Sequence, residues 1–111
     1  MIPIIKLLNN AQRVYFGIKG QDIPKNLQKE YGLENGVYVR EVENASPALA
    51  SGIKAGDILV EVAGEPVDGI RSFADVILER STREIVQVKL LRKTEDGLRE
   101  MTVDVLLIEK K

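Results

Sequence analysis

The chain has 111 residues, of which 44% are hydrophobic and 30% are charged, a balance typical of one soluble globular domain. Sixteen basic and seventeen acidic residues are scattered along it, so the net charge is −1 and no basic stripe predicts nucleic-acid binding. Because cysteine and histidine are absent, the chain can form neither a disulfide nor a histidine-dependent catalytic triad, and it lacks the commonest metal ligand.

Residues 1–13 predict a short amphipathic helix, because apolar residues recur there at helical spacing: Ile4, Ile5, Leu7, Leu8 and Ala11. No apolar run approaches the ~20 residues that a membrane-spanning helix needs, so we expect no membrane insertion by this chain. Tyr15 to Gly20 predicts a strand entered through a tight turn. A helical segment is expected next, with Asp22 as its cap, Pro24 at an early position and Gly32 at its end.

The middle of the chain predicts two strands and a short helix. Residues 36–42 carry apolar side chains on both faces, which indicates a central strand partly covered on each side. Ser46 and Pro47 suit the N-cap and first position of a helix that stops before Gly52. Residues 57–62 then predict a buried strand.

The rest of the chain predicts a longer helix and a hairpin. The helix is expected over Ser72–Arg80, with Asp68 as an alternative start. Strands over Ile85–Arg92 and Leu98–Leu107 are joined by a segment that ends in Asp96-Gly97, a strong hairpin signal. Five strands and a few small helices predict an α+β fold, either a partly open five-stranded β-barrel or a sandwich, capped by helices.

Candidate catalytic and metal-binding groups are few. The serines near predicted helix ends are expected to be caps rather than nucleophiles: Ser46, Ser51, Ser72 and Ser81. Asp57 and Glu61 share one face of a strand, but no third carboxylate accompanies them and calcium requires six to eight oxygens, so solvated charges or turn caps are the expected roles. The glycines form no phosphate-binding motif. We therefore expect no enzyme activity, metal or cofactor in this chain.

Three separated motifs together resemble one family. They are YFGI at residues 15–18, the hairpin with its Asp-Gly turn, and the run SPALASGIKAGDILVEVAGEPV at residues 46–67. In this order and spacing, over residues 15–107, they resemble a PDZ domain of an HtrA-like (trypsin-like) serine protease, in the circularly arranged bacterial form. The implied division is a connector helix from a protease domain at residues 1–13, a PDZ domain at residues 14–108 and a tail at residues 109–111.

The resemblance implies a loop that binds the terminal carboxylate of a peptide: Tyr15, Phe16, Gly17 and Ile18. Successive backbone N–H groups in a tight turn converge on an anion, and hydrogen bonds to a charged group are about twice as strong as neutral ones. Gly17 lets the turn close without a Cβ clash, so we expect Gly17→Val to lose peptide binding while the fold survives. The edge over Ile18, Lys19 and Gly20 would pair with the peptide as an added strand.

The predicted long helix would form the opposite wall of the groove. Residues at i, i+4 and i+7 share a helix face, and Ile70, Ala74 and Ile77 are apolar at this spacing. The pocket for the last peptide side chain, expected to be Val, Leu, Ile or Phe, would be lined by Phe16, Ile18, Ala74 and Ile77. In one alternative, the helix is rotated so that Phe73, Ile77 and Arg80 face the groove. In another, the apolar residues assigned to the groove are only part of the hydrophobic core.

The implied function is a peptide-binding regulatory module that captures hydrophobic C-termini by β-augmentation for an HtrA-like quality-control serine protease. Its partners would be C-terminal peptides of misfolded or signalling proteins and the covalently linked protease domain. The resemblance implies an extracytoplasmic location at the cell envelope, with this fragment soluble. One alternative is a structural or oligomerisation adaptor whose groove is filled by its own or a neighbouring subunit's segment, and another is a PDZ domain of a different protease or a secretion component.

Overall fold

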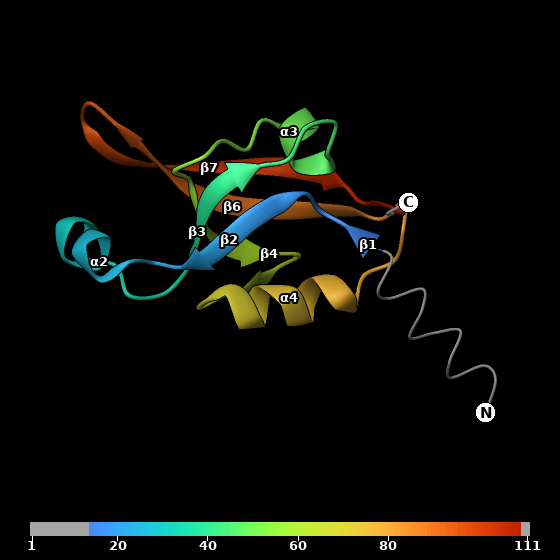
Figure 1. The fold of residues 1–111 in the computed structure, drawn as a ribbon, viewed down its shortest axis with the longest axis horizontal. Helices are drawn as coiled ribbons and strands as arrows, with labels where there is room; N and C mark the ends of the chain where they lie inside the picture. The colour runs from blue at the N-terminus through green and yellow to red at the C-terminus, as the bar shows by residue number, and fades with distance from the viewer. Residues whose placement is uncertain (1–13, 110–111) are drawn as a thin grey trace.

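Residues 14–109 are described by a computed structural model, and one antiparallel sheet dominates it (Figure 1). Five strands of this sheet are hydrogen-bonded in the order β2-β3-β4-β6-β7. Their bounds are β2 Ile18–Asp22, β3 Val37–Val42, β4 Ile58–Val62, β6 Ile85–Thr94 and β7 Gly97–Leu106. The two-residue strand β5 (Glu65–Pro66) pairs with β4, and a separate ribbon joins β1 (Val14–Tyr15) to β8 (Ile108–Glu109).

The predicted α+β class is confirmed and a strand lies near each of the five predicted places, but the first begins at Ile18 and not at Tyr15, which lies in the separate β1–β8 ribbon. The sheet stays open, with β2 at one edge of the strand order and β7 at the other, so the strands are not closed into a barrel. The β6–β7 hairpin turns at the expected Asp-Gly, where Thr94 pairs with Gly97 and Gly97 has a φ of +111°. A positive φ is readily available to glycine, which explains why the turn is made at this residue.

The short helix α3 (Pro47–Ser51) begins and ends as predicted. The Ser46 Oγ accepts a hydrogen bond from the Leu49 N–H at 3.1 Å, and Pro47 occupies the first turn, where its missing N–H costs nothing. Gly52 ends the helix in the left-handed conformation, with a φ of +94°. These local signals lie within a few residues of the helix, and tertiary contacts do not override them.

The expected cap of the preceding helix is wrong. Helix α2 (Lys25–Tyr31) begins after Pro24 and has no side-chain cap, although it does end at Gly32 as expected. Asp22 instead ends strand β2, where it lies opposite Val37 of β3. From that position its Oδ1 accepts a hydrogen bond from the Ile70 N–H of a different helix, at 2.8 Å. Asp22 therefore caps a helix that follows it by 48 residues in the chain.

The hydrophobic core lies between the sheet and helix α4 (Ile70–Leu78), which begins two residues before the predicted Ser72. Phe73, Val76 and Ile77 of α4 are buried, and Val37 and Val39 of β3 are fully buried beneath them in the same core cluster. The connector helix expected at residues 1–13 lies outside the described residues. No helix within residues 14–109 is long and apolar enough to cross a bilayer.

Candidate peptide-binding site

The carbonyl groups of the loop between β1 and β2 accept hydrogen bonds from other parts of the chain. The Phe16 C=O accepts a hydrogen bond from the Ala48 N–H of α3 at 2.9 Å, and the Gly17 C=O accepts one from the Glu43 N–H at 2.8 Å. A trans peptide unit points its C=O and its N–H to opposite sides. The N–H groups of Gly17 and Ile18 therefore point away from α3 and β3, which is the arrangement that an anion-binding turn requires.

Gly17 has two physical reasons to be glycine. Its φ is +99°, a conformation that L side chains rarely adopt, and a Cβ built on it would lie 2.2 Å from the Cβ of Ser46. Ser46 is itself the N-cap of α3, so a side chain at position 17 would displace that cap. The close approach to Ser46 therefore argues against the expectation that Gly17→Val leaves the fold largely intact.

An apolar cleft of about 310 Å³ is lined by the same loop. It runs between the loop and α4, and it contains all four predicted pocket residues. Its lining consists of Val14, Tyr15, Phe16, Gly17, Ile18, Glu43, Phe73, Ala74, Ile77 and Leu78. The structure thus brings together residues from β1, β2 and α4 that a terminal peptide side chain would contact.

Phe16 and Phe73 form the bottom of this cleft. Their rings pack edge to face, with centroids 5.0 Å apart and an interplanar angle of 83°. Both rings also belong to the core, with only 5% and 6% of their surface exposed, whereas Ala74 is exposed. Phe16, Phe73 and Ile77 therefore belong both to the hydrophobic core and to the lining of the cleft. Arg80, placed toward the groove in one alternative, is not among the lining residues and donates a hydrogen bond to Glu84.

Sequence reasoning missed three residues of the lining, Val14, Glu43 and Leu78. Leu78 follows Ala74 by four residues, so the helical spacing contains a signal for it. Glu43 has no local signal, because its partner Tyr15 is 28 residues away. The Tyr15 hydroxyl donates to the Glu43 Oε1 at 2.5 Å, and this hydrogen bond, with desolvation and the nearby negative charge, raises the pKa of Tyr15. Glu43 is the one charged side chain in the lining.

The remaining predicted groove residues lie beyond the cleft. Lys19 is exposed and forms an ion pair with Glu41 at 3.4 Å. Gly20 and Ile70 do not line the cleft, and the Ile70 side chain lies close to Gly20 in the middle of β2. The strand-pairing role of Ile18, Lys19 and Gly20 stays a prediction.

The carboxylates considered as cation ligands are both engaged by basic side chains. Asp57 is buried, accepts two hydrogen bonds from Arg92 at 2.9 and 2.7 Å, and accepts another from the Lys54 N–H. The hydrogen bonds to Asp57 raise the pKa of Arg92. Glu61 pairs with Lys89 at 3.2 Å. Asp57 is therefore a turn cap in a buried ion pair and not a solvated charge.

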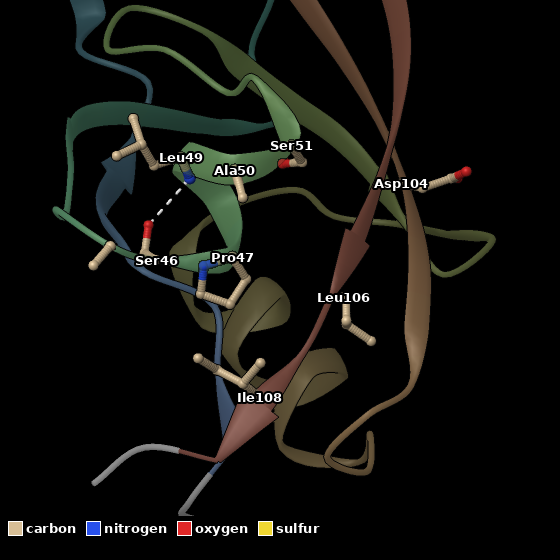
Figure 2. A pocket seen from close by; sticks show the side chains of 9 residues that line it. Ser46, Pro47, Leu49, Ala50, Ser51, Asp104, Leu106 and Ile108 are labelled. Carbon is tan, nitrogen blue, oxygen red and sulfur yellow. Dashed lines mark hydrogen bonds between the residues drawn. The ribbon is translucent and has the colours of Figure 1, made fainter.

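A second hollow lies on the other side of α3, between this helix and the C-terminal strands. Figure 2 shows Pro47 and Ala50 of α3 on one side, with Leu106 and Ile108 on the other. The Ser46 cap bond to the Leu49 N–H, drawn as a dashed line, lies beside it. This hollow shares no lining residue with the cleft.

Known proteins resemble this chain over most of its length. The PDZ domain family matches residues 15–105. A probable periplasmic serine endoprotease DegP-like of Rickettsia conorii is 35% identical over 95 residues, which cover 81% of this chain and 19% of the relative. The serine protease Do-like HtrA of Bacillus subtilis is 31% identical over 111 residues, 89% of this chain and 25% of the relative. The chain thus spans a quarter or less of these two relatives.

A solved structure shares the fold. The crystal structure of the HtrA3 PDZ domain, bound to the phage-derived ligand FGRWV, superimposes with a TM-score of 0.71 at 24% sequence identity. The match covers 88% of this chain and 89% of that one. It supports the same arrangement of strands and helices in both proteins.

Proposed function

This chain belongs to the PDZ domain family, of the kind found in HtrA-like serine endoproteases, and on this premise we propose that its cleft binds the carboxyl-terminal residues of other polypeptides. The observation that supports the proposal is the orientation of the loop: the Phe16 and Gly17 carbonyls accept hydrogen bonds from Ala48 and Glu43, so the next amides point away from these partners, and the loop lines the cleft. A terminal carboxylate accepting these N–H groups would place the last side chain among Phe16, Ile18, Ala74 and Ile77.

The rest of the ligand would extend along the edge of the sheet. Strand β2 is the first in the strand order and pairs with β3 alone, so its outer side is available to an added strand within the described part of the chain. Pairing of a peptide with Ile18, Lys19 and Gly20 would supply main-chain hydrogen bonds, while the cleft selects the final side chain. The apolar lining favours Val, Leu, Ile or Phe there, and the HtrA3 ligand also ends in valine.

For the protein to which such a chain belongs, we propose an HtrA-like quality-control serine protease in an extracytoplasmic compartment at the cell envelope. The relatives' names support this, since they include periplasmic serine endoproteases. The domain would capture hydrophobic C-termini of misfolded or signalling proteins for a covalently linked protease domain. The chain itself supplies recognition, and the catalytic residues would belong to that other domain.

Isothermal titration tests carboxylate recognition directly. Five-residue peptides ending in Val, Leu, Ile or Phe should bind in the micromolar range, about −8 kcal/mol or weaker. Amidation of the terminal carboxylate should reduce affinity roughly tenfold or more, because it removes a charged acceptor. Equal binding of the acid and amide forms would refute the proposed role of the loop.

A charge placed in the cleft tests its location. Ala74→Glu adds a carboxylate to the exposed wall of the cleft, where it repels the ligand carboxylate and fills the pocket, so binding should be lost. Ala50→Glu is the matched control, since Ala50 is also exposed on a helix but lines the other hollow. Equal affinities of the two variants would place the ligand elsewhere.

The structural adaptor is the second candidate, and the exposed hollow beside α3 is the observation that favours it. Leu49, Leu106 and Ile108 there are 49%, 50% and 38% exposed, which is unusual for large apolar side chains in one place. In this function the groove would be filled by a segment of the same or a neighbouring subunit. A chain that sediments as an oligomer and binds no member of a random C-terminal peptide library would favour the adaptor.

A further inference from the structure

The cleft proposed for a peptide carboxylate carries a negative charge of its own. Within the described part of the chain, Glu43 is the only charged side chain in the lining, and no lysine or arginine accompanies it. The loop would therefore hold the ligand carboxylate with backbone N–H groups, beside a side chain of the same charge. Like charges repel each other at short range, so Glu43 must influence which ligands the cleft accepts.

Glu43 lies directly beside the loop. Its N–H donates to the Gly17 C=O at 2.8 Å, which holds its backbone next to the residues whose amides would contact the carboxylate. Its Oε1 accepts the Tyr15 hydroxyl, whereas within residues 14–109 no hydrogen bond or ion pair engages its Oε2. A neutral hydroxyl that donates a hydrogen bond orients the carboxylate and leaves its charge intact. The half-buried side chain therefore presents a fixed negative charge in the wall of the cleft.

Cations on the neighbouring elements do not neutralise Glu43. Lys19 of β2 is exposed, pairs with Glu41 at 3.4 Å and lies outside the lining. The two charged residues of α4, Arg71 and Asp75, are opposite in sign, and both are exposed and lie outside the lining. Among the charges of these elements, Glu43 is therefore the one that acts on a ligand from within the wall of the cleft.

We propose that Glu43 selects ligands by charge, favouring hydrophobic C-termini with a lysine or arginine shortly before the last residue over C-termini with aspartate or glutamate there. This inference rests on the proposed function. The charge of Glu43 is screened over about 8 Å at physiological ionic strength, and an extended strand advances about 3.3 Å per residue. Its influence therefore covers roughly the two residues before the last one. A basic side chain at these positions offsets the repulsion between Glu43 and the ligand carboxylate.

A peptide charge series tests this inference. Acetylated peptides that end in valine with a free carboxylate, and differ only in a lysine, alanine or glutamate before the valine, are titrated into the whole chain. The lysine peptide should bind the wild type about threefold tighter than the alanine peptide, and the glutamate peptide about threefold weaker, as expected for unit charges about 8 Å apart near water. At about 1 M salt, where the screening length falls to about 3 Å, the three affinities should agree within about twofold.

Two variants that each remove one negative charge separate the local effect of Glu43 from that of net charge. Glu43→Gln keeps the size of the side chain and an oxygen acceptor for Tyr15. It should bind the alanine peptide about threefold tighter and reduce the difference between the lysine and glutamate peptides from about tenfold to less than about threefold. Glu100→Gln is the control, because Glu100 is exposed on β7 at the opposite edge of the sheet from β2. It should leave each affinity within about twofold of the wild type.

The possible failures are distinguishable. Equal wild-type affinities for the lysine and glutamate peptides would overturn the inference while peptide binding stands, and so would a difference that survives about 1 M salt, which needs no variant that folds. An unchanged difference in Glu43→Gln, or an equal loss of it in Glu100→Gln, would overturn it as well. If amidated peptides bind as well as free acids throughout the series, the proposed function fails first, and this inference fails with it.

Discussion

At the scale of single residues, Gly17 and Ser46 lie directly against each other. The missing Cβ of Gly17 leaves room for the Ser46 side chain, which caps α3, and α3 in turn donates the Ala48 N–H to the Phe16 carbonyl. Loop and helix start therefore depend on each other. The YFGI and SPA motifs, 31 residues apart at Tyr15 and Ser46, are parts of one contact.

This contact predicts different costs for two glycine substitutions. Gly17→Ala and Gly52→Ala both place a side chain at a similar positive φ, +99° and +94°, but only the first meets other atoms within 4 Å. Gly52→Ala should cost about 1–2 kcal/mol of unfolding free energy for the left-handed conformation alone. Gly17→Ala should cost about 1–3 kcal/mol more, because it overpacks against Ser46. Urea unfolding measures both, and equal losses would contradict the shared contact.

At the scale of elements, one buried ion pair fastens α3 to the sheet. Arg92 of β6 donates to the Asp57 carboxylate and also to the Gly52 carbonyl that ends α3, at 2.8 Å. Asp57 in turn accepts the Lys54 N–H within the turn that leads into β4. Helix α3 is thereby held at both ends, by Arg92 at its C-terminus and by the β1–β2 loop at its start.

Arg92 and Lys93 are neighbours on β6, and their replacement should change the free energy of unfolding by very different amounts. Arg92→Ala leaves the buried carboxylate of Asp57 without its cation, with the Lys54 N–H still donating to it, and should cost about 3 kcal/mol. Lys93→Ala removes a pair with Glu30 whose side chains are 64% and 50% exposed, and should cost less than about 0.5 kcal/mol. Denaturant midpoints of the two variants check this, and a Lys93 effect as large as that of Arg92 would be inconsistent with the burial of Asp57.

Elements with local signals could be predicted from the sequence, and contacts between distant elements could not. Ser46, Pro47 and Gly52 define α3 within seven residues, and helical spacing correctly places Ala74 and Ile77 on the cleft. Asp22 and Glu43 act on partners 48 and 28 residues away, which only the strand register brings near. Reasoning from neighbouring residues therefore assigns Asp22 to the wrong helix and overlooks Glu43, because a short stretch of sequence does not show which residues of two strands lie opposite each other.

At the scale of the whole molecule, the two edges of the sheet differ in chemistry. The outer face and edge of β7 carry the exposed charges of Arg99, Glu100 and Asp104, which discourage pairing with another strand. The edge of β2 has Gly20 in its centre and Lys19 as its one cation. The molecule thus leaves the edge beside the cleft as the more favourable one for an added strand.

An added strand should stabilise the entire fold, because a ligand that binds only the folded state shifts unfolding by mass action. At a free concentration of 100 times Kd, the gain is about 2.7 kcal/mol. For a domain of this size, that gain corresponds to a rise in Tm of roughly 10 °C or more. Differential scanning calorimetry with a free-acid peptide should show the rise, and its amidated form at the same concentration should show about half of it or less, because its affinity is at least tenfold lower. A similar rise with both forms would contradict recognition through the carboxylate.

The β1–β8 ribbon has a mechanical consequence. It consists of two residue pairs, Val14 with Glu109 and Tyr15 with Ile108, and the chain continues from Tyr15 directly into Phe16 and Gly17. Tension applied between residues 14 and 109 loads these pairs one after the other, as in opening a zipper. After the ribbon opens, the load passes to the β1–β2 loop on one side and, through Leu107, to the end of β7 on the other, where Leu106 pairs with Ile85. A pull on the domain from these two ends would therefore distort the loop of the proposed binding site before the centre of the sheet yields.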